Sequence, residues 1–251
     1  MYQRQAALST KKSLCLDFAA IIGYFGIENR DVLKKFFGVL KEADVSARLR
    51  FVFITGVSKF SKVSLFSELN NLEDLSMQSE YADLLGYTDD ELVNSFRDYL
   101  PALAAENGLS AEECLADLRT WYNGYRFSRR ETKGYNPFSI LNVLKTRFFK
   151  NYWFETGTPS FLVQLIKEKN YPIPNLENLE VQEMFFSTYE LENLRLEALL
   201  FQSGYITIHG YERNFYRLGY PNQEVKTSFL SYIYNSLVEL SNTILKAQCF
   251  I

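Results

Sequence analysis

Residues 50–64 read Arg50-Phe51-Val52-Phe53-Ile54-Thr55-Gly56-Val57-Ser58-Lys59-Phe60-Ser61-Lys62-Val63-Ser64. The apolar, β-prone residues from Phe51 to Ile54 show no alternation, which is typical of a strand that is covered on both faces in a parallel sheet. Hydroxyl and lysine residues begin where this strand should end. Because ligands bind at the carboxyl ends of strands in open α/β sheets, the run predicts an inner strand of a nucleotide-binding sheet.

The composition sets broad limits on the protein class. The 251 residues are 47% hydrophobic, with charges of both signs interspersed and a formal net charge of −3. This balance argues against a global electrostatic attraction to nucleic acid or anionic membranes, although it leaves a local basic patch open. No apolar stretch approaches the roughly 20 residues that span a bilayer, so we expect no membrane segment. Three well-separated cysteines without a C-x-x-C pair indicate reduced thiols and a cytoplasmic location.

The pattern along the chain divides it into residues 1–76, 77–172 and 173–251. The first part holds the strand at residues 51–54 and an amphipathic helix over residues 31–41. The middle part is mostly helical. Its start signals are two capping boxes and two caps that precede a proline, which are Thr88 with Glu91, Ser110 with Glu113, Asn136-Pro137 and Thr158-Pro159.

The last part predicts a helix over residues 194–202, a hairpin and a long helix over residues 224–246. The hairpin pairs residues 205–209 with residues 215–218. Helix, hairpin and helix together favour a small winged-helix-like module. His209, the one histidine, falls in this hairpin, so we expect an exposed or strand-face histidine rather than a catalytic or metal-binding one.

Two further motifs leave alternatives open. Glu224-Val225-Lys226 matches half of a metal-dependent nuclease site, but Pro221-Asn222 precedes it, which favours a helix start with Glu224 near the positive end of the helix dipole. Leu14-Cys15-Leu16-Asp17 could be a strand that ends in a magnesium-binding aspartate. Phe18 stands where a catalytic glutamate would follow, which favours a plain strand or loop aspartate. No confident catalytic residue and no metal site emerges.

Several strings resemble the bacterial AAA-ATPase-like proteins, many of which carry a PD-(D/E)XK nuclease at the carboxyl end. They occur in family order over roughly residues 31–240. The matching strings are residues 51–72, Trp121-Tyr122-Asn123-Gly124-Tyr125-Arg126-Phe127, Tyr135-Asn136-Pro137-Phe138-Ser139-Ile140, residues 152–159, residues 200–205, and Tyr220-Pro221-Asn222 before Glu224-Val225-Lys226.

The resemblance implies a partial α/β ATPase: the last strands of a P-loop-type parallel sheet, a helical lid and the winged-helix-like segment. Family members carry a Gly-Lys-Ser phosphate loop, which this sequence lacks. Asp17 alone could be a remnant of the Walker B strand. We therefore expect an internal fragment that needs no cofactor itself, whereas ATP and Mg²⁺ are implied for the full-length family. Its expected partners are the missing ATPase and nuclease parts or a second copy.

The resemblance also implies roles for a few residues. Thr55 or Ser58 would match a sensor of the terminal phosphate, and Lys59 and Lys62 would add positive charge. The alternative is that Thr55 and Ser58 only cap the turn. Two rival functions stay open, a non-functional remnant and a module that binds DNA or protein, for which the candidate contacts are Arg213, Arg217 and Lys226.

Overall fold

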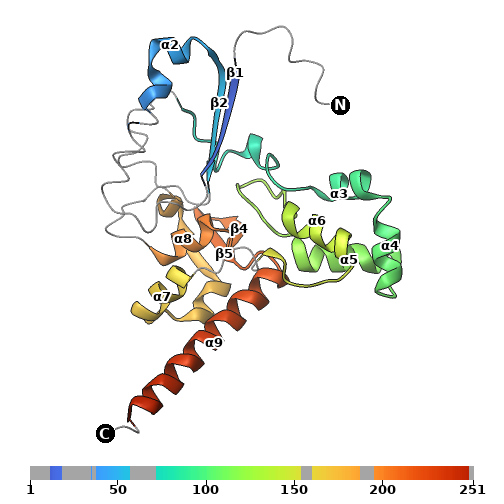
Figure 1. Cartoon of the computed structure of the whole chain (residues 1–251), viewed down its shortest axis with the longest axis vertical. Helices are drawn as coiled ribbons and strands as arrows, with labels where there is room; N and C mark the ends of the chain where they lie inside the picture. The colour runs from blue at the N-terminus through green and yellow to red at the C-terminus, as the bar shows by residue number, and fades with distance from the viewer. Residues whose placement is uncertain are drawn as a thin grey trace. The chain divides into compact units, whose positions relative to one another are not determined.

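The computed structural model describes residues 12–18, 35, 38–56, 72–153, 160–186 and 195–248. The chain forms two compact units (Figure 1). One consists of residues 1–73 with 186–195, and the other of residues 74–185 with 196–251. The architecture is mixed α and β, as the sequence indicates. The division at residues 76 and 172 stays a prediction.

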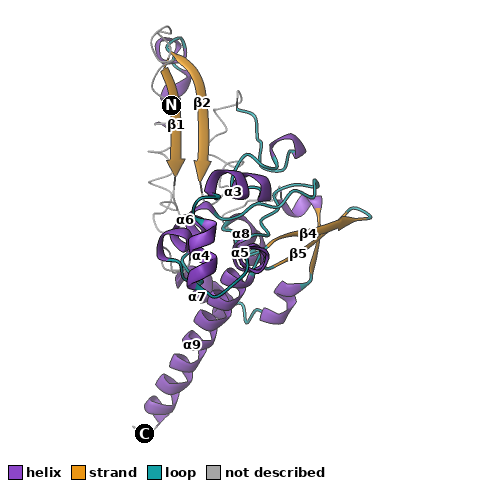
Figure 2. Cartoon of the chain, turned by 90° about the vertical axis from the view of Figure 1, so that its right-hand side faces the viewer, coloured by secondary structure: helices purple, strands orange, loops and turns teal. Residues whose placement is uncertain are grey.

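The first unit contains two parallel strands, β1 (Lys12–Phe18) and β2 (Leu49–Gly56). Figure 2 shows the two arrows side by side and pointing the same way. A short 3₁₀ turn, η2 (Val39–Lys41), and the helix α2 (Ala43–Ser46) precede β2. Most of the helix predicted over residues 31–41 lies outside the described residues.

The strand prediction at residues 51–54 is confirmed, but its burial is not. Phe51 is 58% exposed, and residues 52–55 are only partly buried. The physical reason is the extent of the sheet, because β2 pairs only with β1 within the described part of the chain. The faces of a parallel sheet are covered by the helices that cross between its strands, and β2 shares its sheet with a single strand among the described residues. A complete P-loop-type sheet therefore stays a prediction.

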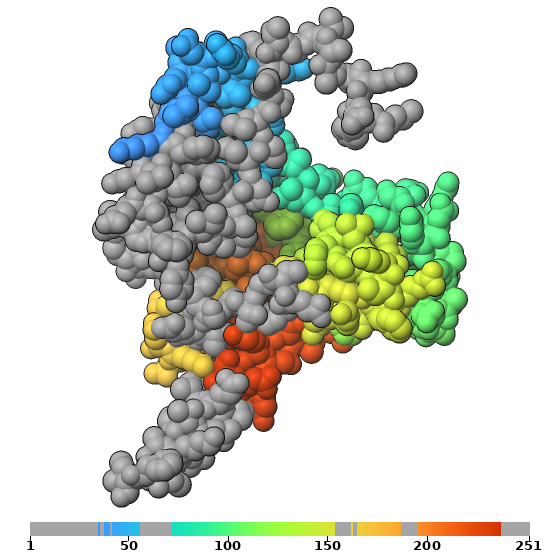
Figure 3. Space-filling model, viewed as in Figure 1, coloured from blue at the N-terminus to red at the C-terminus, as the bar shows by residue number. Residues whose placement is uncertain are grey.

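The second unit begins with a helical body that follows the predicted start signals. After η4 (Ser79–Tyr81) come α3 (Asp89–Phe96), α4 (Leu100–Glu106), α5 (Ala111–Tyr122) and α6 (Pro137–Thr146). Both capping boxes form, and the Asn136 side chain caps α6. The apolar stripes of the four helices meet in one core, which includes Leu92, Leu103, Leu118, Ile140 and Val143. Figure 3 shows this body, cyan to yellow, as a continuous surface.

The rest of the second unit is built around a small antiparallel sheet in the order β3-β5-β4. Its elements are α7 (Ser160–Glu168), η6 (Ile173–Glu177), β3 (Leu179–Gln182), η7 (Glu183–Phe186), α8 (Leu196–Gln202), β4 (Thr207–Glu212), β5 (Phe215–Gly219) and α9 (Gln223–Gln248). The predicted hairpin and the helices at residues 194–202 and 224–246 are confirmed. Thr158-Pro159 lies outside the described residues.

The hairpin differs from its prediction in two respects. β4 extends to Glu212, so the turn is only Arg213-Asn214, and both residues have positive φ, at 50° and 68°. Two positive φ angles are the signature of a type I′ turn, whose twist matches that of the strands. β3 adds a third strand that was not predicted, and the register between β4 and β5 shifts between Ile208 and Gly210. A winged-helix arrangement stays a prediction.

Candidate functional site

The carboxyl ends of β1 and β2 bring together two of the sequence-predicted residues. In the parallel register the Cα of Asp17 is the partner of the Cα of Thr55, one residue before Phe18 and Gly56 end the ladder. Thr55 is partly buried. The other predicted residues of this edge, Ser58, Lys59 and Lys62, lie outside the described residues.

This edge has the residue types of a ligand site but is not a complete one. A carboxylate residue and a hydroxyl residue stand on neighbouring parallel strands at the end where ligands of such sheets bind. However, no three His, Cys, Asp or Glu residues come together to hold a metal ion within the part of the chain that the structure describes. Within that part of the chain, Asp17 and Thr55 alone do not make up a magnesium site.

A second polar arrangement surrounds Glu224, at the start of α9. The Asn222 side chain accepts a 3.0 Å hydrogen bond from the Val225 N–H and so caps this helix. Glu224 lies one residue before Val225 and is completely buried. Its Oε1 accepts hydrogen bonds from the N–H groups of Tyr152, at 2.7 Å, and Trp153, at 2.9 Å. Its Oε2 accepts a 2.7 Å hydrogen bond from the Ser139 hydroxyl. We call these four residues, Ser139, Tyr152, Trp153 and Glu224, the Glu224 cluster.

Burial and hydrogen bonding act in opposite directions on this carboxyl group. Burial raises the pKa of Glu224, while the donors of Trp153, Ser139 and Tyr152 lower it, and burial has the larger effect. Within the described residues its partners are neutral donors rather than an arginine or lysine. The cluster thus holds a carboxyl group that costs free energy to bury in its ionised form.

The helix-start interpretation of Glu224-Val225-Lys226 is confirmed. The sequence did not indicate that Glu224 is buried, because glutamate in the first turn of a helix is usually solvated. Lys226 forms a 2.9 Å ion pair with Glu177, so it takes no part in the Glu224 cluster. The two charged residues of the motif therefore have separate partners.

The segment Gly124-Tyr125-Arg126 follows α5 and is hydrogen-bonded to the antiparallel sheet. Arg126 is 3% exposed, and its backbone exchanges hydrogen bonds of 2.8 and 3.0 Å with the Thr207 hydroxyl at the start of β4. Its guanidinium group donates to the backbone oxygens of Ser128, at 3.0 Å, and Arg129. Arg126 therefore has a structural role, because its guanidinium group is hydrogen-bonded to main-chain oxygens.

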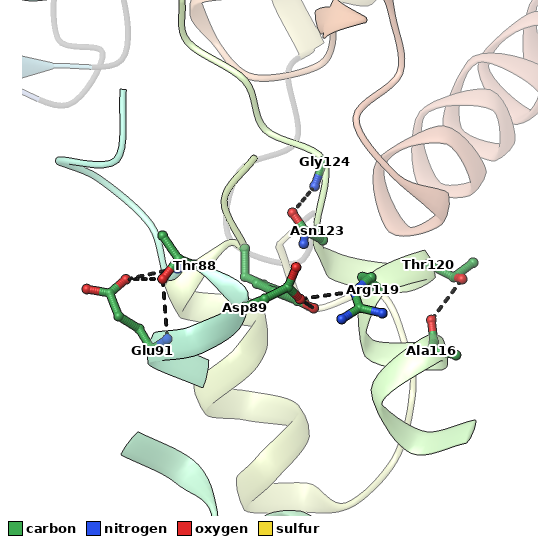
Figure 4. Close-up of polar contacts among 9 residues, drawn as sticks. Thr88, Asp89, Glu91, Ala116, Arg119, Thr120, Asn123 and Gly124 are labelled. Carbon is green, nitrogen blue, oxygen red and sulfur yellow. Dashed lines mark hydrogen bonds and ion pairs between the residues drawn. The ribbon is translucent and has the colours of Figure 1, made fainter. Parts of the chain in front are cut away.

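Asp89 links three segments of the helical body. Its Oδ1 accepts a 3.0 Å hydrogen bond from Arg119 Nε (Figure 4). It also accepts a 2.7 Å hydrogen bond from the Tyr135 hydroxyl. The contacts join the first turn of α3 to α5 and to the segment before α6. Tyr135 is 1% exposed, while Arg119 is largely solvated. These contacts indicate that Asp89 holds neighbouring helices together.

The three candidate contacts for nucleic acid each have an acidic neighbour. Arg213 lies at the hairpin turn, 3.5 Å from a Glu212 oxygen. Arg217 in β5 is the cross-strand Cα partner of Glu180 in β3, and Lys226 is paired as described above. His209 lies exposed on β4, as expected, and its Nε2 is 2.9 Å from the Tyr220 carbonyl oxygen.

Comparisons with known proteins find a family similarity for part of the chain. Residues 24–66, which include β2, match a family described as predicted AAA-ATPase. The match supports an AAA-ATPase-like family. An uncharacterized protein in the vnfD 5′ region of Azotobacter chroococcum mcd 1 is 44% identical over 205 residues, which is 80% of this chain. The chain spans 37% of the length of that relative. No solved structure matches the chain significantly.

No helix within the described ranges combines the length and the apolar character that a membrane crossing needs.

Proposed function

We propose that this AAA-ATPase-like chain contributes the ends of β1 and β2 to a nucleotide site, and that it does not hydrolyse ATP alone. The observation that carries the proposal is the pairing of Asp17 with Thr55 at the carboxyl ends of two parallel strands. The family match over residues 24–66 supports the same part of the chain.

The predicted lack of turnover follows from the sequence. A phosphate loop supplies backbone N–H groups, a lysine and a magnesium-binding hydroxyl, which together do most of the electrostatic work of phosphoryl transfer. The 251 residues contain no Gly-Lys-Ser step. Within the described residues, β2 also pairs on one side only, which leaves its other side for a further strand of an ATPase core.

Photoaffinity labelling tests the nucleotide contact. An azido-ATP would be irradiated with the purified full chain, and trypsin would release the peptide Phe51–Lys59, which contains Thr55 and Ser58. We expect labelling of this peptide to saturate, to be competed by unlabelled ATP and to fall in Thr55→Val. The control Asp44→Asn changes an exposed aspartate in α2 and should leave labelling unchanged.

A phosphate-release assay tests the second half of the proposal. With Mg²⁺ and ATP, the unmodified chain should release no more phosphate than its Asp17→Asn variant. Magnesium-dependent release that is abolished by Asp17→Asn would show that the chain is an ATPase by itself. If unlabelled ATP competes with no labelling of the peptide Phe51–Lys59, the proposed nucleotide contact is wrong.

DNA binding by the hairpin is the second candidate, because the Arg213 side chain at the turn is 89% exposed. Its Glu212 neighbour reduces the local positive charge, so we expect at most weak, strongly salt-dependent binding. A mobility-shift titration at low salt would compare the chain with Arg213→Ala/Arg217→Ala, and with Arg97→Ala, which removes an exposed arginine elsewhere. Equal shifts for all three proteins would exclude this role for the hairpin.

A further inference from the structure

Two segments of the second unit touch main chain to main chain at Gly124 and Pro221. Gly124 has a φ of +120°, and a Cβ atom placed there would lie 1.9 Å from the Pro221 carbonyl oxygen. Such an approach is possible only for glycine. It places the following residues, Tyr125 and Asn222, next to each other in the interior of the unit.

These two residues carry buried polar atoms that the protein does not satisfy. Tyr125 is 8% exposed and Asn222 is 9% exposed. Among the described residues, neither the Tyr125 hydroxyl nor the Asn222 Nδ2 has a hydrogen-bond partner. The Asn222 Oδ1 is already occupied by the Val225 N–H. Buried polar groups in folded proteins are almost always paired, with protein or with ordered water.

A third amide lies near the same hydroxyl. The side chains of Asn136 and Asn222 both lie close enough to the Tyr125 hydroxyl to lower its pKa, although burial has the larger effect and raises it. The Asn136 Oδ1 accepts from the Phe138 N–H at 2.9 Å, as the cap of α6. The Tyr125 hydroxyl and the Asn222 Nδ2 therefore come near each other without a hydrogen bond of normal length between them.

We infer that Tyr125, Asn136 and Asn222 hold one internal water molecule. A water oxygen can accept from the amide N–H groups and exchange a hydrogen bond with the Tyr125 hydroxyl, and internal waters typically make two to four such bonds. A cation does not suit amide N–H donors. An anion is disfavoured by the Glu224 carboxyl group, whose charge acts on the Tyr125 hydroxyl. A neutral molecule that both donates and accepts fits the site.

Tyr125→Phe separates a hydrated site from a dry one. If water is bound, the variant removes one of its partners, and the folding equilibrium constant should fall about fivefold to tenfold. If the site is dry, the variant removes an unpaired hydroxyl, and the constant should stay unchanged or rise. Tyr99→Phe alters a 59% exposed tyrosine and serves as the neutral control. Tyr122→Phe removes a hydroxyl bonded at 3.0 Å to the Lys150 carbonyl oxygen and serves as the positive control.

A double-mutant cycle with Asn222→Ser and a crystal structure of the unmodified chain complete the test. Serine keeps a capping oxygen for α9 but removes the Nδ2 donor. We expect the two substitutions to be non-additive, and density for a water oxygen about 2.8 Å from the Tyr125 hydroxyl. A well-ordered map without that density would overturn the inference, even if Tyr125→Phe fails to fold. Additive effects together with an unchanged Tyr125→Phe would overturn it as well.

Discussion

Ser139 and Glu224 are 85 residues apart in the chain, and the Ser139 hydroxyl donates a 2.7 Å hydrogen bond to Glu224 Oε2. The contact joins the first turn of α6 to the first turn of α9. Together with the Tyr152 and Trp153 N–H groups, it gives the buried carboxyl group three donors. Removal of the carboxyl group would leave these donors unpaired in the interior.

Glu224→Ala should therefore destabilise the protein by about 3–5 kcal/mol, because it orphans buried donors and opens a cavity. Glu224→Gln should change stability by less than about 1.5 kcal/mol. Its carbonyl oxygen can accept from both N–H groups, and its amide can donate to Ser139. Urea unfolding measures both effects. Glu112→Ala is the matched control, since Glu112 is an exposed glutamate in the first turn of α5. Equal losses for Glu224→Ala and Glu112→Ala would contradict the role of the cluster.

The same cluster predicts a pH dependence. Burial raises the pKa of Glu224 in the folded protein above its value in the unfolded chain. The folded state therefore binds this proton more tightly, and the stabilisation is fully present below the unfolded pKa of about 4.3. It is lost as the pH rises through the folded pKa. The stability of the unmodified chain relative to Glu224→Gln should thus improve on acidification toward pH 4, and a constant difference across urea titrations would refute this.

Gly124→Ala should be the most disruptive of the simple glycine substitutions. The new methyl group meets the Pro221 carbonyl oxygen and the backbone has a φ of +120°, so we expect a loss of about 3 kcal/mol or more. Gly108→Ala is a matched control, since Gly108 also has a positive φ, of +64°, but nothing lies within 4 Å of the added atom. That variant should lose about 1 kcal/mol. Thermal unfolding of the two variants should rank them in this order, and the reverse order would contradict the close approach at Pro221.

Thr88→Ala should destabilise the protein by about 1 kcal/mol, because Thr88 is the cap of α3 and exchanges hydrogen bonds with Glu91 (Figure 4). Thr120→Ala, in contrast, removes a hydroxyl that only donates to the Ala116 carbonyl oxygen within α5. Since alanine is the better helix former, this control should lie within about 0.5 kcal/mol of the unmodified chain. Indistinguishable melting curves for the two variants would count against the capping box.

Local signals made much of the second unit predictable. The Thr88 and Ser110 capping boxes close over three residues, and the Asn136 cap reaches two to three residues ahead, so sequence spacing contains nearly all of their geometry. The hairpin is local as well. β3 was missed because its four residues pair with β5 far along the chain, and a short strand has no strong periodicity of its own.

The Glu224 cluster could not be predicted for a similar reason. Nothing near Glu224 in the sequence distinguishes a buried carboxyl group from a solvated one, since its donors come from residues 71 to 85 positions away. Phe51 shows the opposite error. The apolar residues beside it in the sequence indicate a strand covered on both faces, but this cover comes from helices packed on the sheet, which the residue types of one strand do not reveal.

The register shift at His209 has a consequence for how this protein behaves at high concentration. Among the described residues β4 is an outer strand of its sheet, and its main-chain groups would be a template for a neighbouring molecule if they formed a regular row. The irregularity between Ile208 and Gly210 interrupts that row near its middle. Self-association by strand addition is thereby discouraged at this side of the hairpin, without any charged side chain being required for the purpose.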